Sequence, residues 1–281
     1  MKKSLLIAAS LMLCTGNLMA QPKASEPRLL IKSSQSLMAP VWSPDGKKIA
    51  VTGDNYIGIW VANADGSDLK QVSDELGAGY KMSWLNNSTI VSTPYTVVND
   101  RRMTSIEQVN VETGKVTEVA AAEHNFKRSK AAVKTNKYYK LMVDDPAGAT
   151  SQISVLKDYA GRMIINPQLS HDGTMIAFQI VGKGIFMIDD KATMALFVDK
   201  GSYPQFTNKD SNVAFVKLED DGANFTKGEI YSFDIVKRKI SKIDIHRDDL
   251  LPVTLAADYD GSAIAFENDK DGYIYLIDLT Y

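Results

Sequence analysis

The sequence predicts an all-β fold: a six-bladed β-propeller of four-stranded blades, whose ring is closed by the N-terminal strand. The first observation is a phrase that recurs at a spacing of roughly 40 residues, which is typical of repeat architectures. The second is the Asp-Gly pair at the centre of most copies, and the third is a last repeat that lacks one strand. The clearest copies are Pro40–Val51, Pro167–Phe178, Pro204–Phe215 and Leu255–Phe266.

Each copy of the phrase has the pattern of a β-hairpin. In the first copy a short strand runs into Pro44-Asp45-Gly46 and continues into Lys47–Thr52. Glycine tolerates the positive φ of a tight turn, and the β-branched and aromatic residues that follow favour a strand. The phrase therefore predicts the two inner strands of a blade.

The first repeat contains every part of a blade. After the hairpin, a loop at Gly53–Tyr56 leads to a third strand, and a turn at Asn63–Ser67 leads to a fourth. Four short antiparallel strands in about 40 residues make one propeller blade, and no window carries a sustained helical period. The expected strands are Ala39–Ser43, Lys47–Thr52, Ile57–Ala62 and Asp68–Val72.

The later repeats give the blade count. The third repeat matches the phrase least well, with Tyr138–Val143 and Gln152–Leu156 as its expected strands, and it leaves five or seven blades as alternatives. The sixth repeat has no fourth strand, and the unassigned segment Arg28–Ser33 would supply it. A ring closed in this way leaves no open sheet edge. Repeats two to six are expected at Tyr80–Val119, Arg128–Ile165, Pro167–Val198, Pro204–Ile243 and Pro252–Tyr281.

The N-terminal segment predicts export. Met1-Lys2-Lys3 is basic, Ser4–Cys14 is a short apolar run, and Leu18-Met19-Ala20 ends in a small residue. This layout is that of a secretory signal peptide, residues 1–20, and the run is shorter than the roughly 20 residues that a membrane span needs. A lipid anchor on Cys14 is the other interpretation of this segment. We expect residues 21–281 to form a single propeller domain in the periplasm, without a transmembrane segment.

Charge and cysteine content narrow the classes of partner. The segment 1–20 contains two lysines and no acid, so the remainder has 30 basic and 34 acidic residues, a net charge of about −4. Nucleic-acid binding favours a basic face, so we expect no nucleic-acid partner. Cys14 is the only cysteine of the sequence, which leaves the domain without disulfides or thiolate chemistry.

The phrase Pro40-Val41-Trp42-Ser43-Pro44-Asp45-Gly46, followed by Ile59-Trp60-Val61 and Asp65-Gly66, resembles the WD40-like repeat of the TolB family. The resemblance covers residues 21–281. It implies a six-bladed periplasmic propeller and binding of a protein of the cell envelope. TolB itself has an α/β domain ahead of its propeller, and only Gln21–Pro27 could occupy that place here.

The sequence gives little support for catalysis, a cofactor or a metal. Its three histidines are His124, His171 and His246, and no Gly-x-Ser-x-Gly nucleophile motif is present. His171 falls inside the phrase and is expected to be a turn residue. The Asp-Gly pairs are isolated turns rather than a calcium loop, although the acidic segments Glu219–Gly222 and Asn268–Gly272 leave a weak cation site open. We therefore expect a non-enzymatic protein.

The two faces of the predicted disc differ. The connections between the first two and the last two strands of each blade are short turns, whereas the other connections are longer and emerge on the opposite face. Aromatic residues and arginines on loops over a rigid scaffold are typical of recognition surfaces. The expected partner-binding residues are Tyr95, Arg101, Arg102, Phe126, Arg128 and Arg247.

Two functions of different classes fit this sequence. The preferred prediction is a monomeric, non-catalytic module that binds a protein or peptide of the cell envelope over the loop-rich face. The alternative is a small-ligand or carbohydrate sensor, or a processing enzyme, that uses the central channel. The expected innermost strands carry no ionisable side chains, as in Pro167-Gln168-Leu169 and Pro204-Gln205-Phe206, which weighs against chemistry in the channel.

Overall fold

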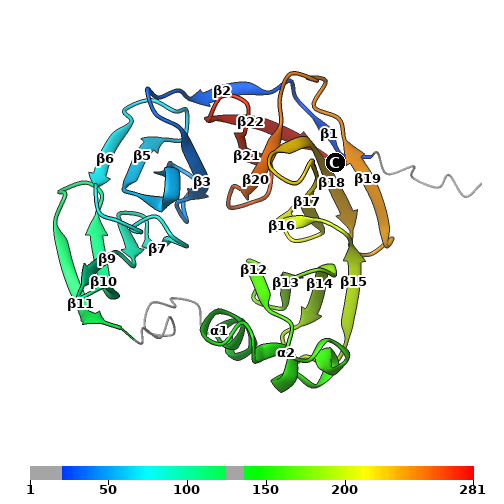
Figure 1. Ribbon diagram of the computed structural model, residues 1–281. Coiled ribbons are helices and arrows are strands. Elements are labelled where there is room, and N and C mark those ends of the chain that lie inside the picture. Colours follow the sequence, from blue (N-terminus) through cyan, green and yellow to red (C-terminus); the bar gives the residue numbers. More distant parts are fainter. Residues whose placement is uncertain (1–20, 125–135) are drawn as a thin grey trace, which may run out of the picture.

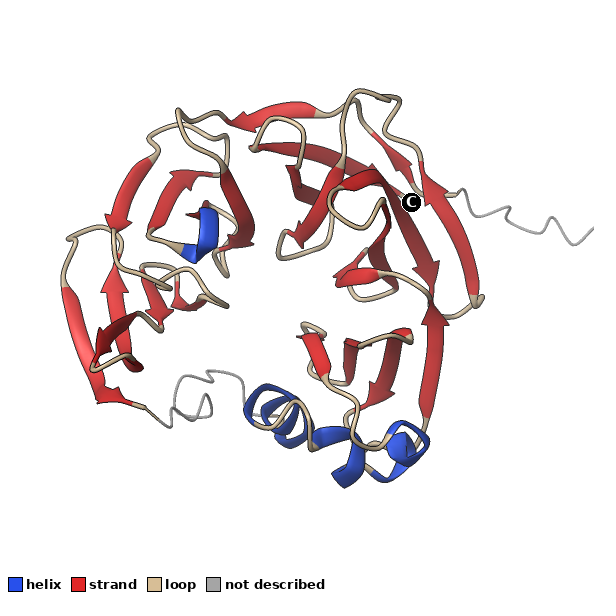
Figure 2. Cartoon of the chain, viewed as in Figure 1, coloured by secondary structure: helices blue, strands red, loops and turns tan. Residues whose placement is uncertain are grey.

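The computed structural model describes residues 21–124 and 136–281, and these residues form a ring (Figure 1). Five antiparallel β-sheets surround a central axis, each with its first strand innermost (Figure 2). We number these sheets blade 1 to blade 5 in chain order. Blade 1 contains β3 (Leu37–Trp42), β4 (Lys48–Gly53), β5 (Ile59–Asn63) and β6 (Lys70–Ser73), with the short 3-10 helix η1 (Asp54–Tyr56) between β4 and β5.

Blades 2 to 4 follow the same order, and blades 2 and 4 carry long hairpins. Blade 2 contains β7 (Ser83–Asn86), β8 (Thr89–Ser92), β9 (Tyr95–Val98), β10 (Arg101–Asn110) and β11 (Val116–Glu123). Blade 3 contains β12 (Ile164–Leu169), β13 (Met175–Ile180), β14 (Gly184–Asp189) and β15 (Ala195–Asp199). Blade 4 contains β16 (Ser202–Thr207), β17 (Asn212–Asp220), β18 (Phe225–Asp234) and β19 (Lys239–Ile243).

Blade 5 is completed by the N-terminal segment, as the sequence predicts. Its own strands are β20 (Pro252–Ala257), β21 (Ala263–Asn268) and β22 (Tyr273–Thr280). Both β1 (Lys23–Ala24) and β2 (Arg28–Ile31) pair antiparallel with β22, with Lys23 opposite Thr280 and Arg28 opposite Leu276. The closing edge is therefore longer than the expected Arg28–Ser33 strand.

The prediction of six blades is wrong, because the third repeat is helical. Its place between blades 2 and 3 holds α1 (Lys137–Asp144), α2 (Ala149–Gln152) and the 3-10 helix η3 (Ser154–Tyr159) (Figure 1). The expected strand Tyr138–Val143 lies within α1, and the expected strand Gln152–Leu156 spans the end of α2 and part of η3. The all-β propeller of four-stranded blades is confirmed with five blades.

Local chemistry explains why this repeat folds as a helix. The Asn136 side chain accepts hydrogen bonds from the backbone N–H groups of Tyr138 and Tyr139, at 3.0 and 3.1 Å, which caps the first turn. Tyr138, Leu141 and Met142 recur at helical spacing and pack against blade 3. The segment also lacks the Asp-Gly turn that starts the hairpin in the other repeats. Its short apolar run has a helical period, which an assignment to strands overlooks.

The hydrophobic core lies between neighbouring blades rather than inside them. One cluster joins Leu37 and Ile49 of blade 1 to Ile274 of blade 5, and another joins Val213 of blade 4 to Ala177 of blade 3. Neighbouring sheets thus bury apolar faces against one another. At the helical position, Met142 and Leu156 pack on the face of blade 3 that another blade would otherwise cover. On this side of blade 3 the helices therefore supply the apolar surface that a blade would otherwise provide.

Among the described residues, no helix has the length and apolar character that crossing a membrane requires. The expected signal peptide, residues 1–20, lies outside the described residues.

The N-terminal strands should be needed for stability, because they cover the outer edge of β22. Deleting residues through Ser33 removes the pairing of both β1 and β2 and the ion pair between Arg28 and Asp278. We expect this variant to melt at a lower temperature than a chain that starts at Gln21, and to aggregate through its exposed edge. Equal melting temperatures of the two chains would contradict the closure.

Two turn glycines with similar backbones should differ in their tolerance of a side chain. Gly173 and Gly261 have φ values of 74° and 69°, but a Cβ at Gly173 meets nothing within 4 Å, whereas one at Gly261 would lie 2.2 Å from the Cα of Thr207. We expect Gly173→Ala to cost about 1 kcal/mol of unfolding free energy from backbone strain alone. Gly261→Ala should cost about 1–3 kcal/mol more, because it also forces two blades apart. Urea titration of both variants measures the difference, and equal costs would contradict the close approach.

Candidate functional site

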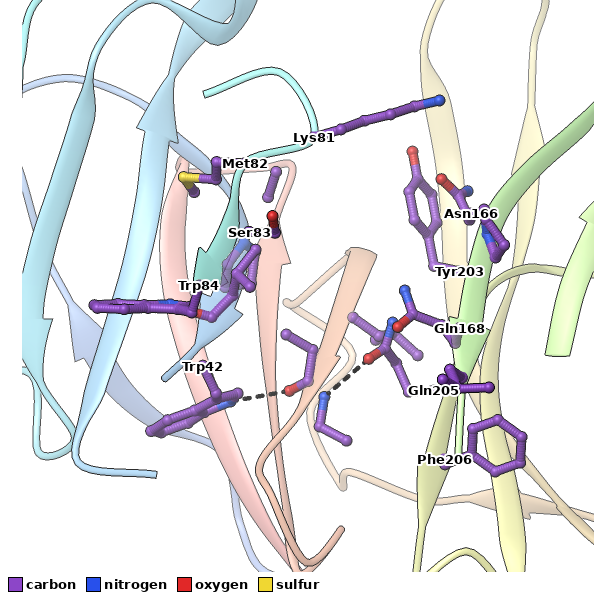
Figure 3. A pocket seen from close by; sticks show the side chains of 18 of the residues that line it. Trp42, Lys81, Met82, Ser83, Trp84, Asn166, Gln168, Tyr203, Gln205 and Phe206 are labelled. Atoms are coloured by element: carbon purple, nitrogen blue, oxygen red, sulfur yellow. Dashed lines mark hydrogen bonds between the residues drawn. The ribbon is translucent and has the colours of Figure 1, made fainter. Parts of the chain in front are cut away.

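A cavity of about 600 Å³ follows the axis of the ring and is lined by the innermost strand of every blade (Figure 3). Its wall combines indole rings, aliphatic side chains and side-chain amides. Helix α1 contributes Tyr139 and Val143 to the same wall. The principal residues are Trp42, Lys81, Met82, Ser83, Trp84, Asn166, Gln168, Leu169, Tyr203, Gln205, Phe206 and Leu255.

A recurring bulge near the start of the inner strands aims side chains at one end of this cavity. The register of blades 1, 3 and 4 shifts around Ala39, Asn166 and Tyr203, which have left-handed φ values of 49°, 50° and 54°. Lys81, directly before β7, is left-handed as well, with a φ of 53°. Bulges redirect side chains near functional sites. Because inner strands start on the face that bears the longer loops, Lys81, Asn166 and Tyr203 lie at the loop-side mouth (Figure 3).

Hydrogen bonds between blades hold the middle of the cavity wall. The Trp42 indole donates to the carbonyl of Ala256 in blade 5, and the Trp84 indole donates to the carbonyl of Val41 in blade 1, both at 3.1 Å. The Gln205 side-chain oxygen accepts from the backbone N–H of Ala257 at 3.4 Å. Two of these bonds are drawn in Figure 3. Trp42 and Trp84 therefore join neighbouring blades and hold the cavity wall in place.

The loop-side mouth is aromatic and carries the Lys81 ammonium. Tyr56 and Tyr80 meet edge to face with ring centres 5.0 Å apart, and the Lys81 ammonium lies 5.5 Å from the Tyr80 ring centre. Burial, together with the nearby Tyr56 and Glu267, raises the pKa of Tyr203 to about 12, so its hydroxyl stays protonated. Burial also raises the pKa of Glu267, whose carboxyl accepts a hydrogen bond from the Thr254 hydroxyl at 2.8 Å.

The opposite mouth is tied together by a different set of contacts. His171 lies in the turn between β12 and β13, and its Nδ1 is 2.9 Å from a carboxylate oxygen of Asp210 in blade 4. The His171 ring also meets Tyr259 of blade 5 edge to face at 4.7 Å. Asn208 and Lys209 donate their backbone N–H groups to the turn of blade 5. The short turns of three blades are thus joined around this end of the cavity.

Three of the expected partner-binding residues lie together on blade 2. Tyr95 begins β9, and the Arg102 guanidinium stacks 3.9 Å from the Tyr95 ring centre. Arg101 is exposed beside the tip of the β9–β10 hairpin and pairs with Val98 across it. Tyr95 also packs on Gly77, where a Cβ would approach its ring to 2.6 Å. Tyr95 therefore has a structural task in addition to any role in binding.

Arg247 lies apart from this group, in the connection between β19 and β20. Its guanidinium donates two hydrogen bonds of 2.6 Å to Asp249, and it lines a second, shallow cavity of about 210 Å³. Blade 2 and this connection lie on opposite sides of the ring (Figure 1). Phe126 and Arg128 lie outside the described residues. The six expected residues thus do not form one described cluster.

None of Tyr95, Arg101, Arg102 and Arg247 lines the central cavity. The residues that the surface prediction omitted are Lys81, Asn166 and Tyr203, at the bulges. The sequence contains one signal for them. Each directly precedes the residue at which an inner strand is expected to begin, namely Met82, Pro167 or Pro204. Nothing in the phrase itself indicates that the preceding residue is left-handed.

In the two acidic segments, where the sequence left a weak cation site open, carboxylates accept hydrogen bonds from their own turns. Asp221 accepts hydrogen bonds from the backbone N–H groups of Ala223 and Asn224, and Asp271 accepts from the backbone of Tyr273 and the hydroxyl of Tyr275. Within residues 21–124 and 136–281, no group of three or more His, Cys, Asp or Glu side chains is arranged to hold a metal.

The cavity is suited to binding a ligand of mixed character. Its volume lies in the range of ordinary ligand sites, with apolar walls and a few convergent polar groups. The Lys, His and Asp side chains along its lining are separated, with Lys81 at the loop-side mouth and His171 and Asp258 at the other. The middle offers amides and indole rings, which recognise shape and hydrogen-bonding groups.

Comparisons with known proteins agree with the fold. No protein-family model matches the chain, and no curated protein matches it in sequence. The chain is similar to the β-propeller domain of Cps50 (Swd1) from Myceliophteria thermophila, with a TM-score of 0.51 and 10% identity over 89% of this chain and 98% of that one. It is also similar to an oligogalacturonate lyase from Vibrio parahaemolyticus, with a TM-score of 0.44 and 10% identity over 92% and 96% of the two chains. At such identities the first likeness shows the propeller fold alone.

Glu107, on the inner half of the blade 2 hairpin, should make stability depend on pH. Burial, followed by the neighbouring Glu75 carboxyl, raises the Glu107 pKa to about 7. The folded state then binds a proton that the unfolded state releases near its ordinary pKa, so stability is lost as pH rises from about 4.5 to 7. We expect Glu107→Gln to raise the melting temperature at pH 8 by about 2 °C and to leave it unchanged at pH 4.

Thermal melting between pH 4 and 8 measures this effect. Glu26→Gln, which removes an exposed carboxyl, is the matched control and should leave the pH profile unchanged. A parallel profile for Glu107→Gln and the unaltered chain would contradict the raised pKa.

Proposed function

We propose that this protein is an exported, non-catalytic β-propeller of the TolB-like kind, which binds a protein or peptide segment of the bacterial cell envelope. The bound segment reaches into the central cavity from the face that bears the longer loops. The observation that supports this most is the cavity of about 600 Å³, which offers amides and aromatic rings from several blades at once. A volume of this size suits a few residues of an extended chain.

The elements around the loop-side mouth support a chain-like ligand. The β9–β10 hairpin presents Arg101 and Arg102 on the same face as the mouth, because antiparallel order places both kinds of longer connection at one end of the blades. Val97 and Val98 on this hairpin are 61% and 52% exposed. A segment that fills the cavity could therefore continue over blade 2. Export and the TolB-like assignment rest on residues 1–20 and on the repeat phrase.

A second candidate follows from the cavity itself. Tyr56, Tyr139, Tyr203 and the side-chain amides would also suit a small polar ligand such as a short carbohydrate. In that case the protein is a small-ligand sensor or a processing enzyme, and the hairpin of blade 2 takes no part.

A variant that fills the cavity distinguishes these possibilities. Gln168→Phe places a ring in the cavity, and Gln71→Phe places the same ring on the exposed outer strand β6 as a matched control. The probes are tryptic peptides from an envelope extract and a mixture of neutral oligosaccharides, retained with the protein on gel filtration and identified by mass spectrometry. We expect the unaltered chain and Gln71→Phe to retain peptides, and Gln168→Phe to lose them with its melting temperature unchanged.

Equal retention by Gln168→Phe would place the binding surface outside the cavity and contradict the proposal. Retention of oligosaccharides alone would establish the second candidate instead.

A further inference from the structure

The inner strand of each blade brings one equivalent residue to the wall of the central cavity. In blades 1, 3, 4 and 5 this residue pairs with the alanine of the second strand, and in blade 2 it is Ser83, which directly precedes Trp84 as Val41 precedes Trp42. Because the blades are repeats arranged around one axis, equivalent positions lie at a similar level of the cavity. These axial residues are Val41, Ser83, Gln168, Gln205 and Ala256, and all of them line the cavity.

The axial residues make the two sides of this level different. Gln168 and Gln205 belong to blades 3 and 4, whose inner strands β12 and β16 contact each other. Both side chains are partly buried and reach into the cavity from the same side, whereas Ser83 lies across from them (Figure 3). One wall therefore carries two side-chain amides, and the other positions carry short side chains.

The two amides have hydrogen-bonding capacity that the protein does not use. The Gln205 oxygen accepts a hydrogen bond from the backbone N–H of Ala257 at 3.4 Å, while its NH₂ group has no partner among the described residues. The Gln168 amide makes no hydrogen bond at either end within the same residues. Since a side-chain amide has both an acceptor oxygen and a donor NH₂, the pair can donate and accept at the same time.

The surroundings of this pair are uncharged. The Lys, His and Asp side chains of the described lining lie at the two mouths, and the axial residues include no ionisable group. A charged ligand group at this level would be removed from water without an opposite charge beside it, which is unfavourable. The best match for the pair is an uncharged group that presents an acceptor and a donor together, as an amide does.

We propose that Gln168 and Gln205 form an amide-binding subsite, which takes one uncharged amide of the bound peptide, from an Asn or Gln side chain or from the backbone. This subsite rests on the proposed peptide-binding function and specifies which part of a peptide enters. The Gln205 NH₂ group donates to the carbonyl oxygen of the ligand amide, and the Gln168 oxygen accepts from its N–H. The short side chains of Val41, Ser83 and Ala256 leave room for the chain that carries this amide.

A library of random hexapeptides with acetylated N-termini and methyl-ester C-termini tests the subsite, because these peptides have no terminal charge. Peptides retained by the unaltered protein on gel filtration are sequenced by mass spectrometry. We expect Asp, Glu, Lys and Arg to be depleted at one position of the retained peptides. If a side chain enters, Asn or Gln is enriched there, and its exchange for Asp or Glu weakens binding by about tenfold or more. If the backbone enters, methylation of one peptide nitrogen has that effect.

Three variants connect this preference to Gln168. Gln168→Leu removes the donor and the acceptor at similar size and should weaken the selected peptides by about tenfold. Gln71→Leu, on the exposed outer strand β6, is the matched control and should bind as the unaltered chain does. Gln168→Glu places a carboxylate at the same position and should change the preference there to Lys or Arg, a change that a purely structural role of Gln168 would not produce.

The outcomes separate the subsite from the binding function. Retained peptides with charged residues as frequent at every position as in the library would overturn the subsite and leave the binding function standing. The same holds if Gln168→Leu binds the selected peptides as tightly as the unaltered chain does, or if Gln168→Glu leaves the preference unchanged. If the unaltered protein retains no peptide, both proposals fall.

Discussion

The structure depends on one constraint: the apolar faces of neighbouring sheets in the ring must cover one another. The clusters between blades meet this constraint with β-branched and aromatic side chains such as Val213, Phe215 and Ile264, all fully buried. The burial of such side chains contributes about 1.5–3 kcal/mol each, so an uncovered face would be costly.

This constraint explains why a helical segment can occupy a place in a ring of sheets. What blade 3 requires is an apolar surface on its open side, not strands. Met142, Ile153 and Leu156 supply that surface from α1 and from the segment that contains η3. The helix cap at Asn136 and the helical spacing of the apolar residues suffice to build it. The outer edge of a sheet needs a different cover, and at β22 the N-terminal strands β1 and β2 provide it.

The sequence predicts the hairpin of each matching repeat and the strand that closes the ring, because both follow from local patterns. Asp-Gly turns and alternating strands can be recognised within about a dozen residues. The last repeat lacks one strand, and Arg28–Ile31 occupies that place. The third repeat is harder because Tyr138–Val143 is a short apolar run, and such runs are compatible with a strand or a helix. The Asn136 cap, the helical spacing of the apolar residues and their packing against blade 3 together favour the helix.

The candidate site is less predictable for a physical reason. Gln168 and Gln205 belong to the phrase, which predicts them on the innermost strands, and they do line the cavity. Lys81, Asn166 and Tyr203 owe their place to their own left-handed backbones near the starts of the inner strands, which the tertiary structure imposes. Tyr95 and Arg102 are predictable as neighbours because they lie on one long connection, and they meet for that reason.

The two ends of the ring differ in how their connections are held. At the turn face, Asn208, Lys209 and Asp210 all have left-handed backbones, an unfavourable run that persists because their polar groups join three blades. Because these contacts hold the inner strands of blades 3 to 5 at the turn face, the longer connections at the opposite face are not needed for that purpose. At the loop-side mouth, by contrast, Lys81 and Tyr203 line the cavity from left-handed positions at the starts of the inner strands.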